Sequence, residues 1–173
     1  FTGEYMYLKV VNCPDPDFRP YVERAATFYA KQLIPDGRLR NRCFTKIRFD
    51  ANIQEQGYCS VESYNTRNQP REFLIEIHPG LGAPTILEVL AHEMVHVKQF
   101  LMGQTDDQLA SWMGKRVNYE ETDYWDQPWE IDAHGREPGL LTKFAEKELL
   151  WDIFQGFRNP KLPVVSKPIR WKR

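Results

Sequence analysis

The feature that most constrains this chain is an apolar helical segment, residues 84–101, that carries two histidines and a glutamate near its middle. Apolar residues recur through it at helical spacing and Gly103 follows its end, a pattern that predicts one long, largely buried helix. Polar side chains in a buried helix need partners. His92, Glu93 and His96 are therefore expected to meet polar groups or a ligand from another part of the chain.

The spacing of these three residues is typical of a zinc site. His92 and His96 are four residues apart, so they project from one face of the helix, about one turn apart. Two imidazoles at this spacing can bind one tetrahedral zinc ion. Glu93 can hold a water molecule on the metal and take its proton, provided that it is not itself a ligand. The alternative is a set of histidines satisfied by ordinary hydrogen bonds in the core or at the surface.

Hydrophobic patterning elsewhere predicts a single α+β domain over residues 1–158, with a small mixed or antiparallel sheet, the histidine-bearing helix and C-terminal helices. Pro138 is expected to divide the C-terminal helical region, because the residue before a proline avoids helical geometry. A basic, proline-containing tail follows at residues 159–173. Strands are predicted at residues 4–12, 45–50, 57–64 and 71–78, and further helices at 17–33, 104–114, 129–136 and 139–157.

Composition excludes several classes of protein. The formal net charge of −1 argues against a globally basic nucleic-acid-binding domain. The longest apolar runs are too short for a transmembrane helix, and the first residues lack a signal-peptide pattern, so we expect no membrane contact. Three widely spaced cysteines predict free thiols, with one disulfide and a spare thiol as the alternative.

The HExxH sequence of residues 92–96, on a helix that follows a predicted strand, resembles that of the zincin metallopeptidases. The resemblance covers residues 46–137 and implies that strand 71–78 is the edge strand, along which an extended substrate would pair. The sequence of residues 96–99 is more similar to small bacteriophage-encoded and SprT-like zinc proteases. Lys98 departs from the wider family pattern, which prefers an apolar residue there.

A catalytic zinc needs a third protein ligand and one open position. Residues 99 and 102 are Gln and Met, which excludes the extended histidine motif of the metzincins. The resemblance to gluzincins implies Glu130 as the third ligand, in a minimal gluzincin-like arrangement. His134, Glu137 and Asp132 are the alternatives, and Glu130 could instead merely favour the N-terminus of its helix.

His134 lies four residues after Glu130, on the same helical face. It is predicted either to act as a catalytic residue that donates to the oxyanion of the reaction, or to make an ordinary interior hydrogen bond. Tyr119 and Tyr124 are candidate phenolic donors, with ordinary packing as the alternative. Glu137 is predicted either to support a ligand histidine or to form a surface ion pair.

These residues predict a zinc metallopeptidase that hydrolyses peptide bonds. Zn²⁺ would be bound by His92, His96 and Glu130, and Glu93 would be the general base. The alternatives are a non-catalytic zinc-bearing module, associated with a virion or with DNA, and a zinc amidase. The expected partner is a protein or peptide substrate, and the expected location is soluble and intracellular, in a host cytoplasm or virion if the chain is phage-encoded.

Charge is unevenly distributed along the chain. Residues 120–137 contain seven acidic residues and one arginine, which predicts either a negative cleft rim that favours basic peptides or a solvated loop. Residues 153–173 contain six lysines or arginines and no acid. This tail is expected either to be simply solvated or to make weak contact with nucleic acid or another anionic surface.

Overall fold

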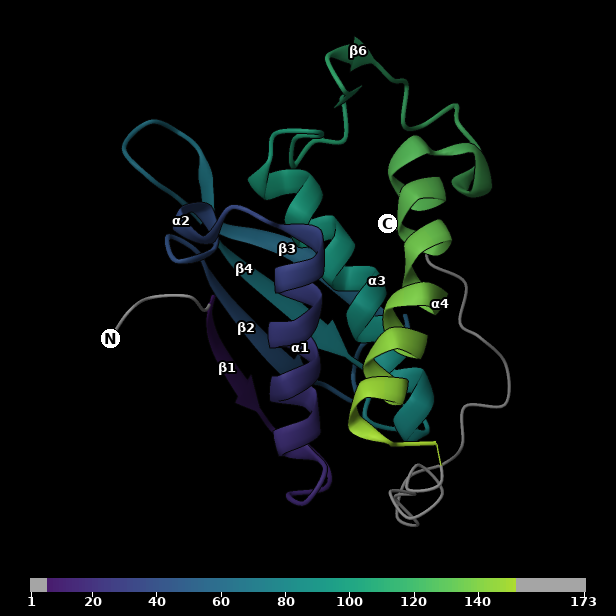
Figure 1. The fold of residues 1–173 in the computed structure, drawn as a ribbon. Coiled ribbons are helices and arrows are strands. Elements are labelled where there is room, and N and C mark those ends of the chain that lie inside the picture. The colour runs from purple at the N-terminus through teal and green to yellow at the C-terminus, as the bar shows by residue number, and fades with distance from the viewer. Residues whose placement is uncertain (1–5, 152–173) are drawn as a thin grey trace.

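The computed structural model describes residues 6–151 and has an α+β fold, as predicted (Figure 1). A mixed four-stranded sheet, three long helices and a small two-stranded ribbon make up this part of the chain. In chain order the elements are β1 (Tyr7–Val11), α1 (Arg19–Leu33), α2 (Gly37–Arg40), β2 (Phe44–Phe49), β3 (Gly57–Tyr64), β4 (Pro70–Ile77), α3 (Ala83–Leu101), β5 (Ser111–Trp112), β6 (Lys115–Arg116), the 3₁₀ turn η1 (Tyr124–Asp126) and α4 (Pro128–Glu148).

The main sheet has the strand order β1-β2-β4-β3. Strands β1, β2 and β4 are parallel, and β3 is antiparallel to β4. The prediction that residues 71–78 form the edge strand is therefore wrong, because β4 is hydrogen-bonded on both sides. The hairpin that joins β3 to β4 makes β3 the outer strand of this pair, and the parallel pairing with β2 takes up the other side of β4.

In the described part of the chain, helices cover one face of the sheet and no helix covers the other. Side chains alternate between buried and less buried along β2 and β4, so a single face carries the core. Helix α1 packs on β1, α3 packs on β3 and β4, and the two helices contact each other over the sheet (Figure 1). On the open face, Arg48 pairs with Glu76 at 2.7 Å.

Helix α3 is the central element of the described chain, because it lies between α1 and α4 as well as against the sheet (Figure 1). Pro84 stands in its first turn, where the missing N–H costs no hydrogen bond. Nearly every residue from Ile86 to Leu101 is buried, which confirms the predicted helix. The Tyr29 hydroxyl donates to the Leu87 carbonyl at 3.0 Å and ties α1 to α3.

Helix α4 is continuous from Pro128 to Glu148, so the predicted break at Pro138 is wrong. Pro138 has no N–H to offer the His134 carbonyl, which forfeits one helical hydrogen bond. The helix continues because its later turns are buried, with the Phe144 ring centroid 5.9 Å from that of Tyr29 on α1. The predicted extension of this helix is wrong at residues 149–151, because α4 ends at Glu148 and Leu149 adopts a left-handed conformation. Residues 152–157 and the tail 159–173 lie outside the described residues.

The segment between α3 and α4 is a connection of turns, and the helix predicted at residues 104–114 is wrong. The Asp106 carboxylate accepts hydrogen bonds from the Gln108 and Ala110 amides and from the Ser111 hydroxyl, which holds a compact turn instead. The tight β5–β6 connection then uses positive φ at Met113 and Gly114.

The three cysteines are free thiols, as predicted. Cys43 and Cys59 are buried in the core, and burial raises the pKa of Cys43 to about 12. Within residues 6–151, no helix is both long and apolar enough to cross a membrane.

Candidate metal centre

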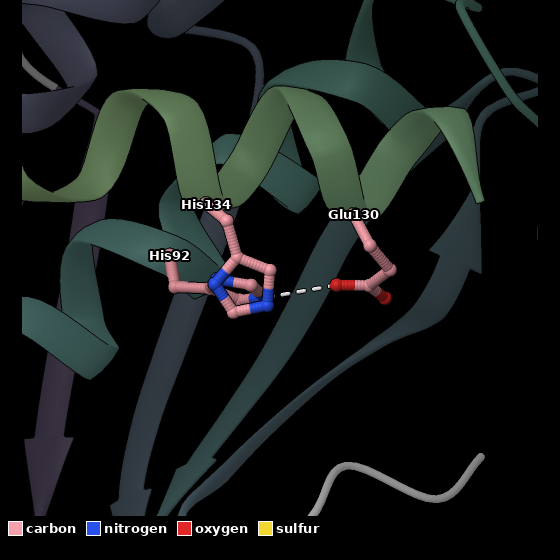
Figure 2. A group of neighbouring side chains, drawn as sticks. All are labelled: His92, Glu130 and His134. Atoms are coloured by element: carbon pink, nitrogen blue, oxygen red, sulfur yellow. Dashed lines mark hydrogen bonds and ion pairs between the residues drawn. The ribbon is translucent and has the colours of Figure 1, made fainter. Parts of the chain in front are cut away.

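Two helices that are distant in sequence bring the predicted ligands together. Figure 2 shows His92 on α3 facing Glu130 and His134, which project from α4. His92, His96 and Glu130 are at most 2% exposed. Ala133 on α4 is fully buried, and its small side chain occupies little of the space between α4 and its neighbours. His92, His96 and Glu130 therefore form a buried polar cluster at the α3–α4 interface, with the partly exposed His134 beside it.

Three atoms of this cluster lie at the corners of a small triangle. His92 Nε2 is 3.1 Å from His96 Nε2 and 3.1 Å from Glu130 Oε2, and His96 Nε2 is 3.4 Å from Glu130 Oε2. Ligands bound to one tetrahedral zinc at ~2.0–2.1 Å are separated from one another by about 3.3 Å. The triangle thus has the dimensions of three corners of a zinc coordination sphere.

The other ring nitrogen of each histidine contacts an oxygen acceptor. His92 Nδ1 is 2.5 Å from Glu137 Oε2, and His96 Nδ1 is 2.8 Å from Gln99 Oε1. The Gln99 amide nitrogen donates to the Trp129 carbonyl at 2.9 Å, which fixes the orientation of the amide. An acceptor beside each Nδ1 favours that nitrogen as the donor, and the two Nε2 atoms next to the Glu130 carboxylate are then the candidate metal-binding nitrogens.

The electrostatics of this cluster favour a positive charge. Burial alone would lower the pKa of His92, but hydrogen bonds to Glu130 and Glu137, and the nearby charge of Glu93, outweigh it and raise the pKa to about 10. Burial would likewise raise the pKa of Glu137, but its bonds to His134 and His92 lower it. Two nitrogens and a carboxylate oxygen this close repel one another unless a proton or a metal cation lies between them.

Glu93 is fully buried on α3, immediately after His92. Its charge contributes to the raised pKa of His92, so it belongs to the same electrostatic site. Glu88, one turn earlier, is half-buried, and burial together with the charge of Glu137 raises its pKa. The carboxylates near the candidate metal-binding nitrogens therefore come from both helices.

His134 lies beside the three candidate ligand atoms and is held by several contacts. Its Nε2 is 2.9 Å from the Tyr124 hydroxyl, and its Nδ1 is 3.2 Å from Glu137 Oε1. Its ring lies 4.5 Å from the His92 ring and 4.9 Å from that of Trp125, between centroids. Both nitrogens of His134 thus contact polar partners that support its position.

His134 is also close enough to be a ligand itself. Ligand atoms of His92, Glu130 and His134 all lie within 4.8 Å of one another, so this group could hold a metal ion. The group that includes His96 is more compact, with no separation above 3.4 Å. It also leaves each ligand histidine with an acceptor on its second nitrogen, so we take His92, His96 and Glu130 as the better-fitting set.

The two tyrosine candidates are separated by the structure. The Tyr124 hydroxyl lies 2.9 Å from Glu130 Oε2 as well as from His134, so it is part of the site. Tyr119 packs its ring on Trp129, 6.4 Å between centroids. Asp132, an alternative ligand by sequence, instead pairs with lysine and arginine side chains.

The acidic segment divides into two parts. Four acidic residues before α4 are exposed on the connecting loop, as expected of a solvated loop, whereas the three on α4 turn toward partners in the cluster or on α3. The exposed ones are Glu120, Glu121, Asp123 and Asp126, and the others are Glu130, Asp132 and Glu137.

Sequence reasoning missed the role of Gln99 and left that of Glu137 open. Gln99 is three residues after His96, a spacing that places both on one helical face and could have identified it. Glu137 is seven residues after Glu130, and it shares a face with Glu130 only because α4 continues through Pro138.

Comparisons with known proteins add nothing to these contacts. No protein-family model matches the chain, and neither the curated proteins nor the solved structures include a significant match to it. The chemistry of the centre is accordingly interpreted from its own residues.

Proposed function

We propose that this protein is a zinc-dependent hydrolase of peptide bonds. The single observation that carries the proposal is the convergence of two imidazole nitrogens and one carboxylate oxygen within 3.4 Å of one another, on buried and hydrogen-bonded side chains. This geometry agrees with the resemblance of the HExxH sequence to that of zincins.

The donor set fits zinc better than the commoner hard cations. Two histidines and one carboxylate are a frequent catalytic zinc set, whereas Mg²⁺ and Ca²⁺ prefer oxygen ligands alone. Three protein ligands leave one position of a tetrahedron for a water molecule or a substrate. Zinc bound in such a set lowers the pKa of that water to about 7 and so supplies a nucleophile at neutral pH.

The chain's own residues would then move the protons. Glu93 is placed by its sequence position beside the first ligand, and we assign it the role of general base that later passes the proton to the leaving amine. Tyr124 and His134 lie next to Glu130 and are the candidate donors to the negative oxygen of the tetrahedral intermediate. Protein or peptide substrates are the proposed partners.

The strand β3 is the proposed docking edge for an extended substrate. Among the strands of residues 6–151 it is the outermost one next to α3, and an outer strand is where an extended segment could pair through backbone hydrogen bonds. Beside it lies a groove of about 380 Å³ that residues of the α3–α4 connection complete. Its lining includes Tyr58, Ser60 and Val61 of β3 and Gln108 and Tyr119 of the connection.

The proposal is tested by Glu93→Gln. This change keeps the size of the side chain and the zinc ligands but removes the base, so we expect zinc content to stay at one ion per chain. Hydrolysis of an unfolded protein such as casein should fall by about 10²–10⁴-fold. Glu146→Gln, on the exposed side of α4, is the matched control and should hydrolyse like the wild type.

Two results would contradict the proposal. Undiminished hydrolysis by Glu93→Gln would show that another group is the base. A wild-type protein that binds zinc tightly but cleaves neither proteins nor peptides would favour the non-catalytic zinc module.

A further inference from the structure

A buried cation lies behind the proposed ligands. Lys98, two residues after His96, is only 6% exposed, although lysine is among the residues least often buried. Its ammonium nitrogen is 3.1 Å from Asp132 Oδ2 on α4. Burying an ammonium group is unfavourable unless it is paired and hydrogen-bonded. The pair with Asp132 offsets this cost and holds the Asp132 carboxylate at a fixed place between α3 and α4.

The Asp132 carboxylate also contacts the side-chain amide of Gln99. Asp132 Oδ2 accepts from the amide nitrogen of Gln99 at 3.1 Å, the same distance as from Lys98. Asp132 Oδ1 is held by Arg136 at 2.6 Å. The amide nitrogen of Gln99 is thus held between a charged oxygen and the Trp129 carbonyl, and the amide oxygen must point the other way.

That amide oxygen determines which tautomer of His96 is stable. An acceptor oxygen of Gln99 at 2.8 Å favours the His96 tautomer that carries its proton on Nδ1 and keeps Nε2 as a lone-pair nitrogen. If the amide were reversed, its NH₂ group would face Nδ1 and stabilise the tautomer that is protonated on Nε2. A nitrogen that carries a proton cannot bind a metal.

We propose that Lys98 is a positioning residue for the metal centre: by holding Asp132 it orients Gln99, and Gln99 holds His96 in the metal-binding tautomer. The proposal rests on the proposed zinc site. It assigns a role to the residue at which the chain departs from the zincin pattern. It also predicts that a charge remote from the metal affects metal affinity.

The test compares Lys98→Met, which keeps the length of the side chain and removes its charge, with Lys98→Arg, which keeps the charge. Competition with a chromophoric chelator measures the affinity for Zn²⁺, and ¹⁵N NMR of the metal-free protein identifies the tautomer of His96. We expect Lys98→Met to weaken zinc binding by about 10–100-fold, and to shift His96 toward protonation on Nε2. Lys98→Arg should restore both properties.

Matched variants keep the test decisive. Lys143→Met removes a lysine charge from the exposed side of α4 and should leave affinity and tautomer unchanged. Asp132→Asn removes the other half of the ion pair at a more exposed position, and it should reproduce the loss even if Lys98→Met fails to fold.

The outcomes distinguish this inference from the proposed function. If Lys98→Met and Asp132→Asn bind zinc like the wild type and retain its His96 tautomer, the positioning role is wrong while the zinc site stands. If the wild type itself binds no zinc, the proposed function fails first.

Discussion

At the scale of single residues, Glu137 supports two imidazoles at once. One oxygen contacts Nδ1 of the ligand His92, and the other contacts Nδ1 of His134. A carboxylate in this position fixes the orientation of a ligand ring and increases its basicity. Glu137 therefore connects the proposed metal ligand to the proposed oxyanion donor.

Replacing this carboxylate should weaken the centre without removing a ligand. Glu137→Gln substitutes a neutral amide, so we expect zinc affinity to fall by about 10–100-fold in chelator competition. The ring of His134 should also gain mobility, visible as broadened imidazole NMR signals. If Glu137→Gln bound zinc as tightly as the control Glu146→Gln, Glu137 would have no role in supporting the metal centre.

Zinc binding should release a proton from His92. The pKa of His92 is raised to about 10 in the metal-free protein, so the residue is protonated throughout the neutral range. Zinc must displace that proton, and the apparent affinity should therefore rise as pH rises, about tenfold per pH unit for one proton. Calorimetric titrations in buffers of different ionisation enthalpy count the protons released, and a count of zero at pH 7 would contradict this prediction.

The residues predicted from sequence were those linked by local spacing. His92, Glu93 and His96 share one helix, so their mutual arrangement follows from helix geometry alone. Glu130 needed the resemblance, since no spacing rule connects two helices separated by a long connection. The sequence identified Lys98 only as a departure from the zincin pattern. Its pairing with Asp132 could not be predicted, because Asp132 lies on the other helix.

At the scale of elements, α4 shows why a strong local signal can fail. Proline disfavours the helical conformation in its neighbours, and this predicted a break at Pro138. Burial of the later turns outweighs that preference, and the uninterrupted helix brings Glu130 and Glu137 onto one face. The site depends on this override, since a broken helix would separate the third ligand from the support of the first.

Restoring the missing helical hydrogen bond should stabilise the protein. Pro138 is exposed, so Pro138→Ala removes no core contact and lets residue 138 donate to the His134 carbonyl. We expect the free energy of unfolding to rise by about 1–3 kcal/mol in urea denaturation, the intrinsic gain being partly offset by a more flexible unfolded chain. A decrease would show that the proline itself shapes the α4 turn that carries His134.

The strands were predicted more accurately than their arrangement. The alternation of residues 71–78 correctly indicated a strand with one buried face. Alternation reports which faces are buried, however, and contains no information about which edges are paired. An interior strand with one exposed face therefore has the same alternating pattern in the sequence as an edge strand.

At the scale of the whole molecule, one hydrophobic core joins the sheet, α1, α3 and the inner face of α4, and the proposed metal ligands are polar side chains beside it at the α3–α4 interface. α3 belongs to this core on one side and contributes to the metal centre on the other. The fold of the sheet and its two helices should therefore persist without metal, while the docking of α4 should gain most from it.

Zinc is accordingly expected to raise the thermal midpoint without being required for folding. At a free zinc concentration of about 100 times Kd, binding should contribute about 2.7 kcal/mol. For a chain of this size, that corresponds to an increase in Tm of about 5–10 °C by calorimetry. Loss of all secondary structure in the presence of a chelator, as seen by circular dichroism, would contradict this expectation.

The division of the ligands between α3 and α4 has a consequence for how the chain could be taken apart. The two helices are joined by residues 102–127, a connection whose exposed turns lie outside the ligand triangle. Cutting the chain at the β5–β6 turn would give one fragment with two ligands and a second fragment with the third. Mixed in solution, the two halves would act as a zinc-gated pair whose association reports the free metal concentration.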